Sequence, residues 1–229
     1  RRARHIVTIS QGLKDFYAAK GLAKEKIFVA HDGVDLEQFA HPQSRKEARM
    51  RLGLPIDAKI AMYIGRLDGW KGVDTFLEAS KLLTDDVTLA VIGGETAQVE
   101  KLSLRYPDVR FIGFRPYREL SDNMAAADVL VLPNTGKSDV SAKFTSPLKL
   151  FAYMASDIPI VASDLPSIRE VLDEHSAFFF RPDDAKALAV GVRRALEKGS
   201  AQAAHARLRV EEYTWKRRVG RILAACTGA

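Results

Sequence analysis

The stretch Lys59-Ile-Ala-Met-Tyr-Ile-Gly-Arg-Leu-Asp-Gly-Trp-Lys-Gly72 decides the fold of this chain. It opens with a short, mostly apolar run that ends at Ile64, turns through the three glycines of Gly65–Gly72, and leads into an amphipathic segment, Val73–Leu83. A strand, a glycine-rich turn and a helix in succession form the unit from which parallel α/β sheets are built. We therefore expect a strand, a loop and a helix over these three segments.

The same alternation recurs on both sides of this unit. Further strands are expected at His5–Ser10, Lys26–Ala30, Val87–Ile92, Val109–Ile112, Val129–Leu132, Pro159–Ala162 and Ala177–Phe180. Helices are expected at Gly12–Lys20, 40–52, Ala97–Arg105, Tyr117–Ala127, Pro147–Ala155, Ser167–Leu172, Asp184–Lys198 and Ala201–Ala225. The pattern predicts an α/β fold with a parallel sheet and helices on both faces, because the strands alternate with helices and are apolar on both sides. Such sheets bind ligands beyond the carboxyl ends of their strands.

The composition is that of a globular protein with a modest positive charge. Of the 229 residues, 47% are hydrophobic and 28% are charged, and 35 Lys and Arg against 29 Asp and Glu give a net charge of +6. This balance suits an anionic ligand or an acidic membrane surface, and it lacks the basic runs of nucleic-acid-binding proteins. The single cysteine, Cys226, forms no disulfide within the chain, which favours a reducing, cytoplasmic setting.

The loop Gly65–Gly72 carries two cations at the carboxyl end of a strand. Arg66 offers a planar fork to phosphate oxygens and Lys71 a point charge, while the following helix adds a favourable dipole. Trp70 stands where a Walker loop needs glycine, and the spacing is not Gly-x-Gly-x-x-Gly. The residues thus indicate an anion site, with an ordinary surface turn as the alternative.

Three more strand ends hold candidate ligand-binding residues. Gly93 and Gly94 let a ligand approach the backbone, Phe111–Arg115 could hold a planar base, and Ser146 with Pro147 is expected to cap a helix whose free N–H groups face an anion. Turn chemistry, core packing and simple capping are the alternatives. The five histidines show no metal spacing, and neither a nucleophile elbow nor a paired set of carboxylates stands out.

Taken in order, these segments resemble the C-terminal domain of group 1 retaining glycosyltransferases, which have the GT-B fold with a Rossmann-like sheet. The matching segments are Val7–Ser10, His31–Asp35, Tyr63–Leu67 with Lys71 and Gly72, Val91–Gly94, Phe111–Gly113, Ala127–Pro133, Ser146–Ala155 and Pro159–Pro166. Each segment is weak evidence alone, and eight in the right order are strong evidence.

The resemblance implies a UDP- or GDP-sugar as donor, transfer with retention, and no metal or other cofactor. Arg66 and Lys71 would stabilise the leaving diphosphate and are the expected catalytic residues. The expected donor-binding residues are Gly65, Gly93, Gly94, Phe111, Gly113, Phe114, Arg115, Thr145, Ser146, Pro147, Leu148 and Ala152. Among them, Phe111–Arg115 would lie against the nucleobase and Thr145–Leu148 against the distal phosphate and sugar.

The resemblance also predicts the domain organisation. Residues 1–40 would be the end of an N-terminal acceptor domain and a linker, and residues 41–229 the nucleotide-sugar-binding domain, with a final helix over 201–225 that packs back towards the acceptor domain. The chain begins Arg-Arg-Ala-Arg, and we expect it to be part of a longer, cytoplasmic polypeptide. It shows neither a signal peptide nor an apolar run of about 18 residues. Many members of the family act on lipid-linked acceptors, and the stretch Arg45–Arg51 is basic, so peripheral contact with the cytoplasmic face of the membrane is one interpretation. The alternative is that this charge is solvated at the protein surface.

The chain departs from the family at three positions. Many members carry two glutamates where this chain has Phe144 and Ala152, and a glycine where it has Asp157. The first glutamate contacts the donor sugar and the second usually binds the ribose. The alternative is therefore a non-catalytic scaffold or partner subunit with a degraded donor site. A nucleotide-sugar epimerase of similar architecture is a weaker alternative, because no set of acid–base residues stands out.

Overall fold

A six-stranded parallel sheet forms the centre of the molecule, whose computed structural model describes residues 3–83 and 87–227. Its strands lie in the order β5-β4-β3-β6-β7-β8. Their bounds are β3 (Lys59–Ile64), β4 (Val87–Ile92), β5 (Arg110–Gly113), β6 (Val129–Leu132), β7 (Ile160–Ser163) and β8 (Phe178–Phe180). The chain builds outwards from β3 to β5 and then from β6 to β8. The order therefore reverses between β3 and β6, and this is where such sheets bind ligands.

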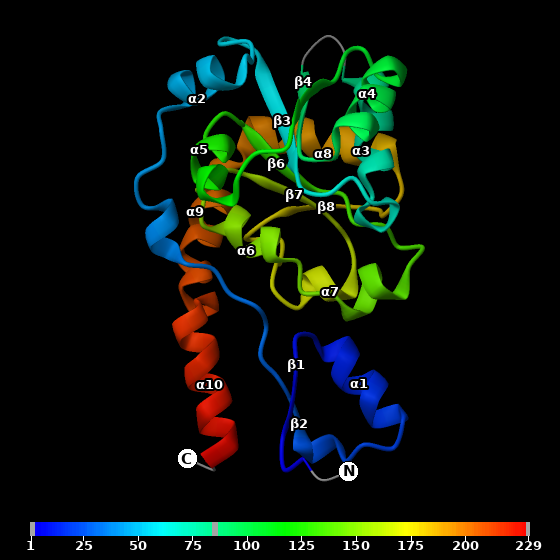
Figure 1. Cartoon of the computed structure of the whole chain (residues 1–229), viewed down its shortest axis with the longest axis vertical. Helices are drawn as coiled ribbons and strands as arrows, with labels where there is room; N and C mark the ends of the chain where they lie inside the picture. Colours follow the sequence, from blue (N-terminus) through cyan, green and yellow to red (C-terminus); the bar gives the residue numbers. More distant parts are fainter. Residues whose placement is uncertain (1–2, 84–86, 228–229) are drawn as a thin grey trace.

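Helices cover both faces of this sheet, as predicted (Figure 1). One apolar core packs against α3 (Val73–Ala79), α4 (Thr96–Arg105) and α8 (Ala185–Lys198). The other packs against α2 (Arg45–Leu52), α5 (Leu120–Met124), α6 (Leu148–Met154), α7 (Pro166–Arg169) and α9 (Ser200–Arg209). The sheet is buried on both sides, which explains why β6 is wholly apolar and why β4 and β7 each contain a single polar residue, Thr88 and Ser163. The predicted Rossmann-like α/β fold is confirmed.

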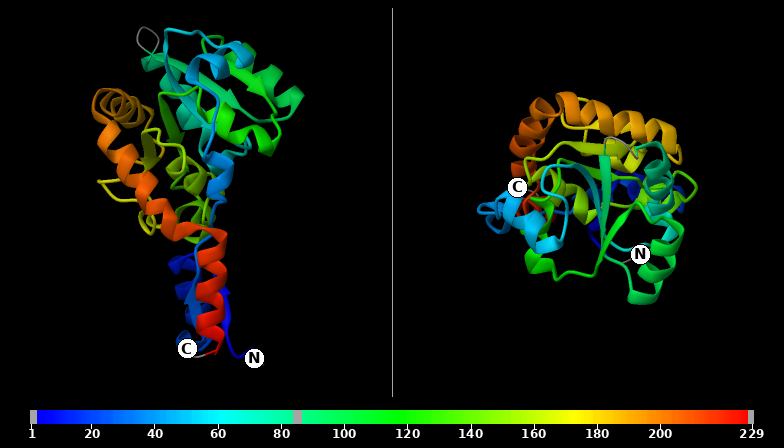
Figure 2. Two further views of the ribbon diagram at one scale, coloured as in Figure 1. Left: turned by 90° about the vertical axis from the view of Figure 1, so that its left-hand side faces the viewer. Right: turned by 90° about the horizontal axis from the view of Figure 1, so that it is seen from above.

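The first strands form a separate, two-stranded sheet. β1 (Ile6–Thr8) pairs in parallel with β2 (Ile27–Val29), and α1 (Gln11–Ala19) connects them. The last helix, α10 (Trp215–Thr227), has no buried residue and extends towards the same end of the elongated molecule (Figures 1 and 2). The division at residue 40 and the packing of the final helix on an acceptor domain remain predictions.

Several boundaries differ from those expected. The helix expected over Val73–Leu83 ends at Ala79 and continues as a 3₁₀ turn, and the one over Tyr117–Ala127 begins with a 3₁₀ turn. The long C-terminal helix is interrupted because Thr214 is extended and forms a parallel bridge with Val34. The two arginines that open the sequence lie outside the described residues.

Candidate functional site

A cavity of about 740 Å³ opens where the strand order reverses. It collects residues from the loop after β3, the segment after β5, the start of α6, the turn after β2 and α10. Ten of the predicted site residues line it: Gly65, Arg66, Lys71, Phe114, Arg115, Thr145, Ser146, Pro147, Leu148 and Ala152. The structure therefore brings together predicted site residues that lie up to 87 positions apart in the sequence, from Gly65 to Ala152.

The loop Gly65–Gly72 is held tightly against its neighbours. The Gly65 N–H donates to Ile92 O at 2.9 Å, and the Tyr63 hydroxyl donates to Arg66 O at 2.5 Å. At Gly72, with φ of 71°, an added Cβ would lie 1.7 Å from Pro133 O, so only glycine fits. The loop is a fixed element of the cavity wall and not a loose surface turn.

The two cations of this loop differ in exposure. The Arg66 side chain is 81% exposed, with its Nε 2.9 Å from a carboxylate oxygen of Asp68. Lys71 lies over the Trp70 ring, with 3.6 Å from Nζ to the ring centroid. Burial lowers the pKa of the Lys71 amine; Asp68 opposes this effect and Arg66 adds to it. Lys71 therefore faces the cavity as a partly desolvated cation. An anion in the cavity would interact with it more strongly than with a lysine in water.

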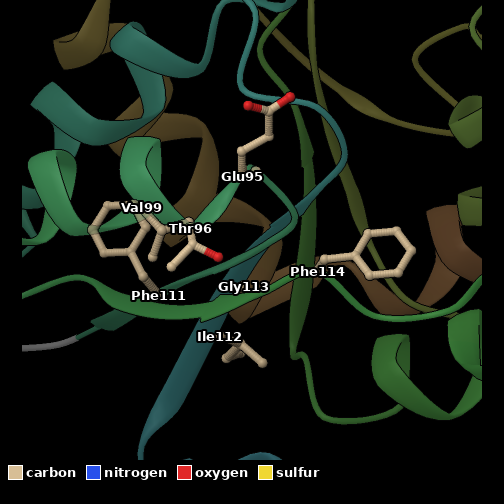
Figure 3. A pocket seen from close by; sticks show the side chains of 8 residues that line it. Glu95, Thr96, Val99, Phe111, Ile112, Gly113 and Phe114 are labelled. Carbon is tan, nitrogen blue, oxygen red and sulfur yellow. The ribbon is translucent and has the colours of Figure 1, made fainter.

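The predicted nucleobase segment is divided between two hollows. Gly94, Phe111 and Gly113 line a neighbouring pocket of about 450 Å³ with Glu95 and Val99. Phe114 borders both hollows and is 73% exposed. In Figure 3, the rings of Phe111 and Phe114 point in opposite directions. The neighbouring pocket is thus lined by both aromatic residues, and the main cavity by Phe114 alone of the two.

Gly93 lines neither hollow. Its φ is 122°, and an added Cβ would lie 2.1 Å from Gly65 O. Its N–H donates to Gly113 O at 2.8 Å. Gly93 therefore allows the end of β4 to approach the cation-bearing loop closely.

The prediction that Ser146 caps the next helix with Pro147 at its first position is wrong. The helix α6 begins at Leu148 with Pro147 at its cap, and no side chain caps it. The Ser146 hydroxyl instead accepts a hydrogen bond from the Asp32 N–H at 3.2 Å, across 114 positions of sequence. The backbone after β2 thus occupies the Ser146 hydroxyl that was expected to cap α6. Thr145, Ser146, Pro147 and Leu148 nevertheless line the cavity.

The two positions that carry glutamates in many relatives lie in different surroundings. Ala152 lines the cavity and is 2% exposed. Phe144 is not among the lining residues; its ring packs on Phe16 of α1 at 5.3 Å between centroids. Asp157 has φ of 57°, the left-handed conformation for which glycine is usual. The cavity wall therefore has a methyl group at 152.

Several lining residues were missed by the sequence analysis. They are Asp32, Tyr117, Lys149 and Trp215, with apolar neighbours. Lys149 had a signal: it is the one charged residue in the otherwise apolar helix Leu148–Met154. Trp215 had none, because it reaches the cavity from the far end of the chain. Its neighbour Arg218 contacts the Asp32 carboxylate and fixes α10 to the turn after β2.

Neither a metal-binding cluster nor a membrane-spanning helix occurs among the described residues. No cluster of three or more His, Cys, Asp or Glu that could hold a metal occurs within 3–83 and 87–227. None of the helices in that part of the chain is both long and apolar enough to cross a bilayer.

The sheet order and the placement of the cavity define a GT-B-type, Rossmann-like domain, and solved structures bear this out. Anabaena HepE in complex with UDP superposes with a TM-score of 0.84 at 19% identity, covering 99% of this chain and 64% of that one. Sucrose-phosphate synthase from Thermosynechococcus elongatus gives 0.80 at 23% identity, with coverage of 99% and 59%. At these identities the likeness concerns the fold.

The family follows from the sequence comparisons. Residues 58–198 match the model of the family "Glycosyl transferases group 1", so the chain belongs to this family. The teichuronic acid biosynthesis glycosyltransferase TuaC of Bacillus subtilis, itself named as putative, is 27% identical over 190 residues, 82% of this chain and 46% of that protein. The D-inositol 3-phosphate glycosyltransferase of Geodermatophilus obscurus is 29% identical over 235 residues, with coverage of 95% and 50%. The chain thus spans about half the length of the curated relatives it matches.

Proposed function

We propose that this chain binds the nucleotide-sugar donor of a glycosyltransferase. The observation that carries the proposal is the convergence of Arg66 and Lys71 on one cavity at the reversal of the sheet, next to the backbone of Thr145–Leu148. A diphosphate needs fixed positive charge, and the same charge stabilises the negative charge that develops on it as the sugar departs. The UDP complexes of the structurally similar HepE support this choice of ligand.

Within this proposal, the residues have separate roles. Arg66 and Lys71 neutralise the diphosphate, and Thr145–Leu148 contact the distal phosphate and the sugar. Phe111–Arg115 provides the surface for the base. The full-length polypeptide would transfer the sugar with retention and without a metal ion. Arg66 and Lys71 would provide the positive charge that a metal ion provides in other enzymes. Its setting would be cytoplasmic, and a lipid-linked acceptor at the membrane face fits the net charge of +6.

Titration calorimetry of the full-length protein with UDP, GDP and their sugars tests the proposal. Arg66→Ala and Lys71→Ala should each weaken binding about ten- to hundredfold, the value of a charge-assisted hydrogen bond. Lys186→Ala on α8 is the matched control, because this exposed lysine lies outside the cavity lining. Absence of binding by the unsubstituted protein, or unchanged binding by both variants, would overturn the proposal.

A second candidate, a non-catalytic scaffold or partner subunit, is favoured by one observation. Ala152 places a methyl group on the cavity wall where relatives use a carboxylate. Sugar transfer by the full-length protein that Lys71→Ala abolishes would exclude this candidate. Nucleotide binding without any transfer to acceptors would favour it.

A further inference from the structure

Lys149 places a buried amine without a counterion in the cavity wall. Part of the residue borders the cavity, but its amine nitrogen is shielded from solvent and has no hydrogen-bond partner among the described residues. It lies over the Tyr63 ring, with 3.9 Å from Nζ to the centroid. Burial lowers the pKa of this amine well below its usual range, and the charge of Lys71 lowers it further. An unpaired amine in such a place is costly to keep protonated.

The groups around Lys149 do not neutralise it. On its own helix, the Tyr153 hydroxyl is engaged with the backbone of Ile64, and on β3 the Tyr63 hydroxyl is engaged with Arg66 O. The remaining charged or titratable groups of the cavity and its loop are Asp32, Arg66, Asp68, Lys71, Arg115 and Tyr117.

Both carboxylates in this set already have partners. Asp68 pairs with Arg66, and Asp32 pairs with Arg218. Asp68 also raises the pKa of Lys71, whereas no carboxylate among the described residues raises the pKa of Lys149. An anion that enters the cavity would supply the missing negative charge.

Gly65 leaves the space in which such an anion could meet the amine. A Cβ at Gly65 would lie 3.4 Å from Lys149 Nζ and 3.2 Å from the Tyr63 hydroxyl oxygen, so the amine lies directly beneath the loop that carries the other cations. A lysine side chain has a flexible four-carbon stem and three rotatable N–H donors. A small rotation would bring these donors to phosphate oxygens held by Arg66 and Lys71.

We propose that Lys149 is a third phosphate-binding residue of this cavity and gains a proton when the diphosphate of a nucleotide sugar binds. The inference rests on the proposed function and deepens it. In the empty cavity, burial and the charge of Lys71 favour the neutral form of this amine. The entering diphosphate compensates the charge, the amine takes up one proton from solvent, and the pair forms as a charge-assisted contact. A purely structural lysine would exchange no proton on binding.

Calorimetry of the full-length protein in buffers of different ionisation enthalpy counts the protons exchanged on binding. UDP-glucose and GDP-glucose are the probes, because their esterified diphosphates have no proton to exchange near neutral pH. The unsubstituted protein should take up protons, approaching one per bound nucleotide sugar at mildly alkaline pH. Lys149→Met should abolish this uptake and weaken binding about ten- to hundredfold. Lys149→Arg, which is always charged, should keep binding but take up none. Lys186→Met on α8 is the matched control and should behave like the unsubstituted protein.

The outcomes separate this inference from the proposed function. Binding without proton uptake, or the same uptake in Lys149→Met, overturns the inference and leaves the donor site standing. No binding of either nucleotide sugar by the unsubstituted protein overturns the proposed function, and the inference with it. Circular dichroism checks the folding of each variant. If Lys149→Met does not fold, the proton count of the unsubstituted protein and the Lys149→Arg variant decide.

Discussion

Replacing the buried amine should change how the stability of the protein depends on pH. In the unfolded chain the Lys149 amine keeps its proton up to about pH 10. In the folded chain its pKa is well below that value, because the amine is buried and Lys71 is close. Between the two pKa values the unfolded state therefore binds one more proton than the folded state. The free energy of unfolding should then rise with pH in this window, and stability should be lost as the pH falls.

The magnitude follows from proton linkage. A difference of one bound proton changes the free energy of unfolding by about 1.4 kcal/mol per pH unit. In Lys149→Met this contribution disappears and a side chain of similar length fills the space. The variant should be the more stable protein near neutral pH, by an amount that falls by about 1.4 kcal/mol for each pH unit between the folded-state pKa and about pH 10. The advantage should shrink as the pH approaches about 10.

Urea denaturation followed by tryptophan fluorescence measures both curves, with Trp70 and Trp215 as reporters in and beside the cavity. The Lys71 amine, whose pKa is also lowered by burial, is present in both proteins, so the difference between the curves reports Lys149 together with its coupling to Lys71. Lys186→Met, at an exposed position of α8, should follow the original curve. Parallel curves for the original protein and Lys149→Met, or a variant less stable at neutral pH, would refute the reasoning.

Three further substitutions test particular positions. Asp157→Gly should raise the free energy of unfolding by about 0.5–1 kcal/mol in thermal denaturation, because φ is 57° there; a loss of stability would contradict the left-handed conformation. Gly93→Ala should lower the free energy of unfolding by about 3 kcal/mol or more, because its Cβ would lie 2.1 Å from Gly65 O. Gly69→Ala is the control: no atom lies within 4 Å of its Cβ, and its free energy of unfolding should change by less than about 1 kcal/mol. Equal effects of the two substitutions would be inconsistent with this geometry. Ala152→Glu should tighten binding of UDP or GDP about tenfold in calorimetry through hydrogen bonds to ribose hydroxyls, and unchanged or weaker binding would show that the ribose lies elsewhere.

The strands and the loop around β3 were predictable because their signals are local. The expected bounds Lys59–Ile64, Val87–Ile92 and Val129–Leu132 are those found, and each is a short apolar run closed by a turn residue. The order of the strands was not in the sequence pattern. Only the sheet reveals that the chain reverses beside β3 and creates the cavity there.

The misses come from contacts between distant segments. The hydroxyl of Ser146 looked like a helix cap, but Asp32 reaches it from 114 positions away. Phe144 packs on Phe16, which no local pattern connects to it. The strand β5 ends at Gly113, so the predicted segment Phe111–Arg115 is divided between the neighbouring pocket, lined by its strand residues, and the main cavity, reached by Phe114 and Arg115 beyond the strand. Local sequence patterns therefore predict where the loops lie, whereas the contacts between distant residues can be identified only in the folded structure.

The two unusual features of α6 bear on the choice between a donor site and a scaffold. Ala152 follows Lys149 by three positions, so both lie on one face of the helix, and a glutamate at 152 would be in reach of the amine. The missing carboxylate and the unpaired cation are thus parts of one arrangement, which leaves the cavity with net positive charge. A chain that had only lost its ligand would gain stability by an apolar residue at 149, because a buried amine without a partner is costly. Such costs are typical of functional sites. Lys149 therefore favours a working anion site over a scaffold that has lost its ligand.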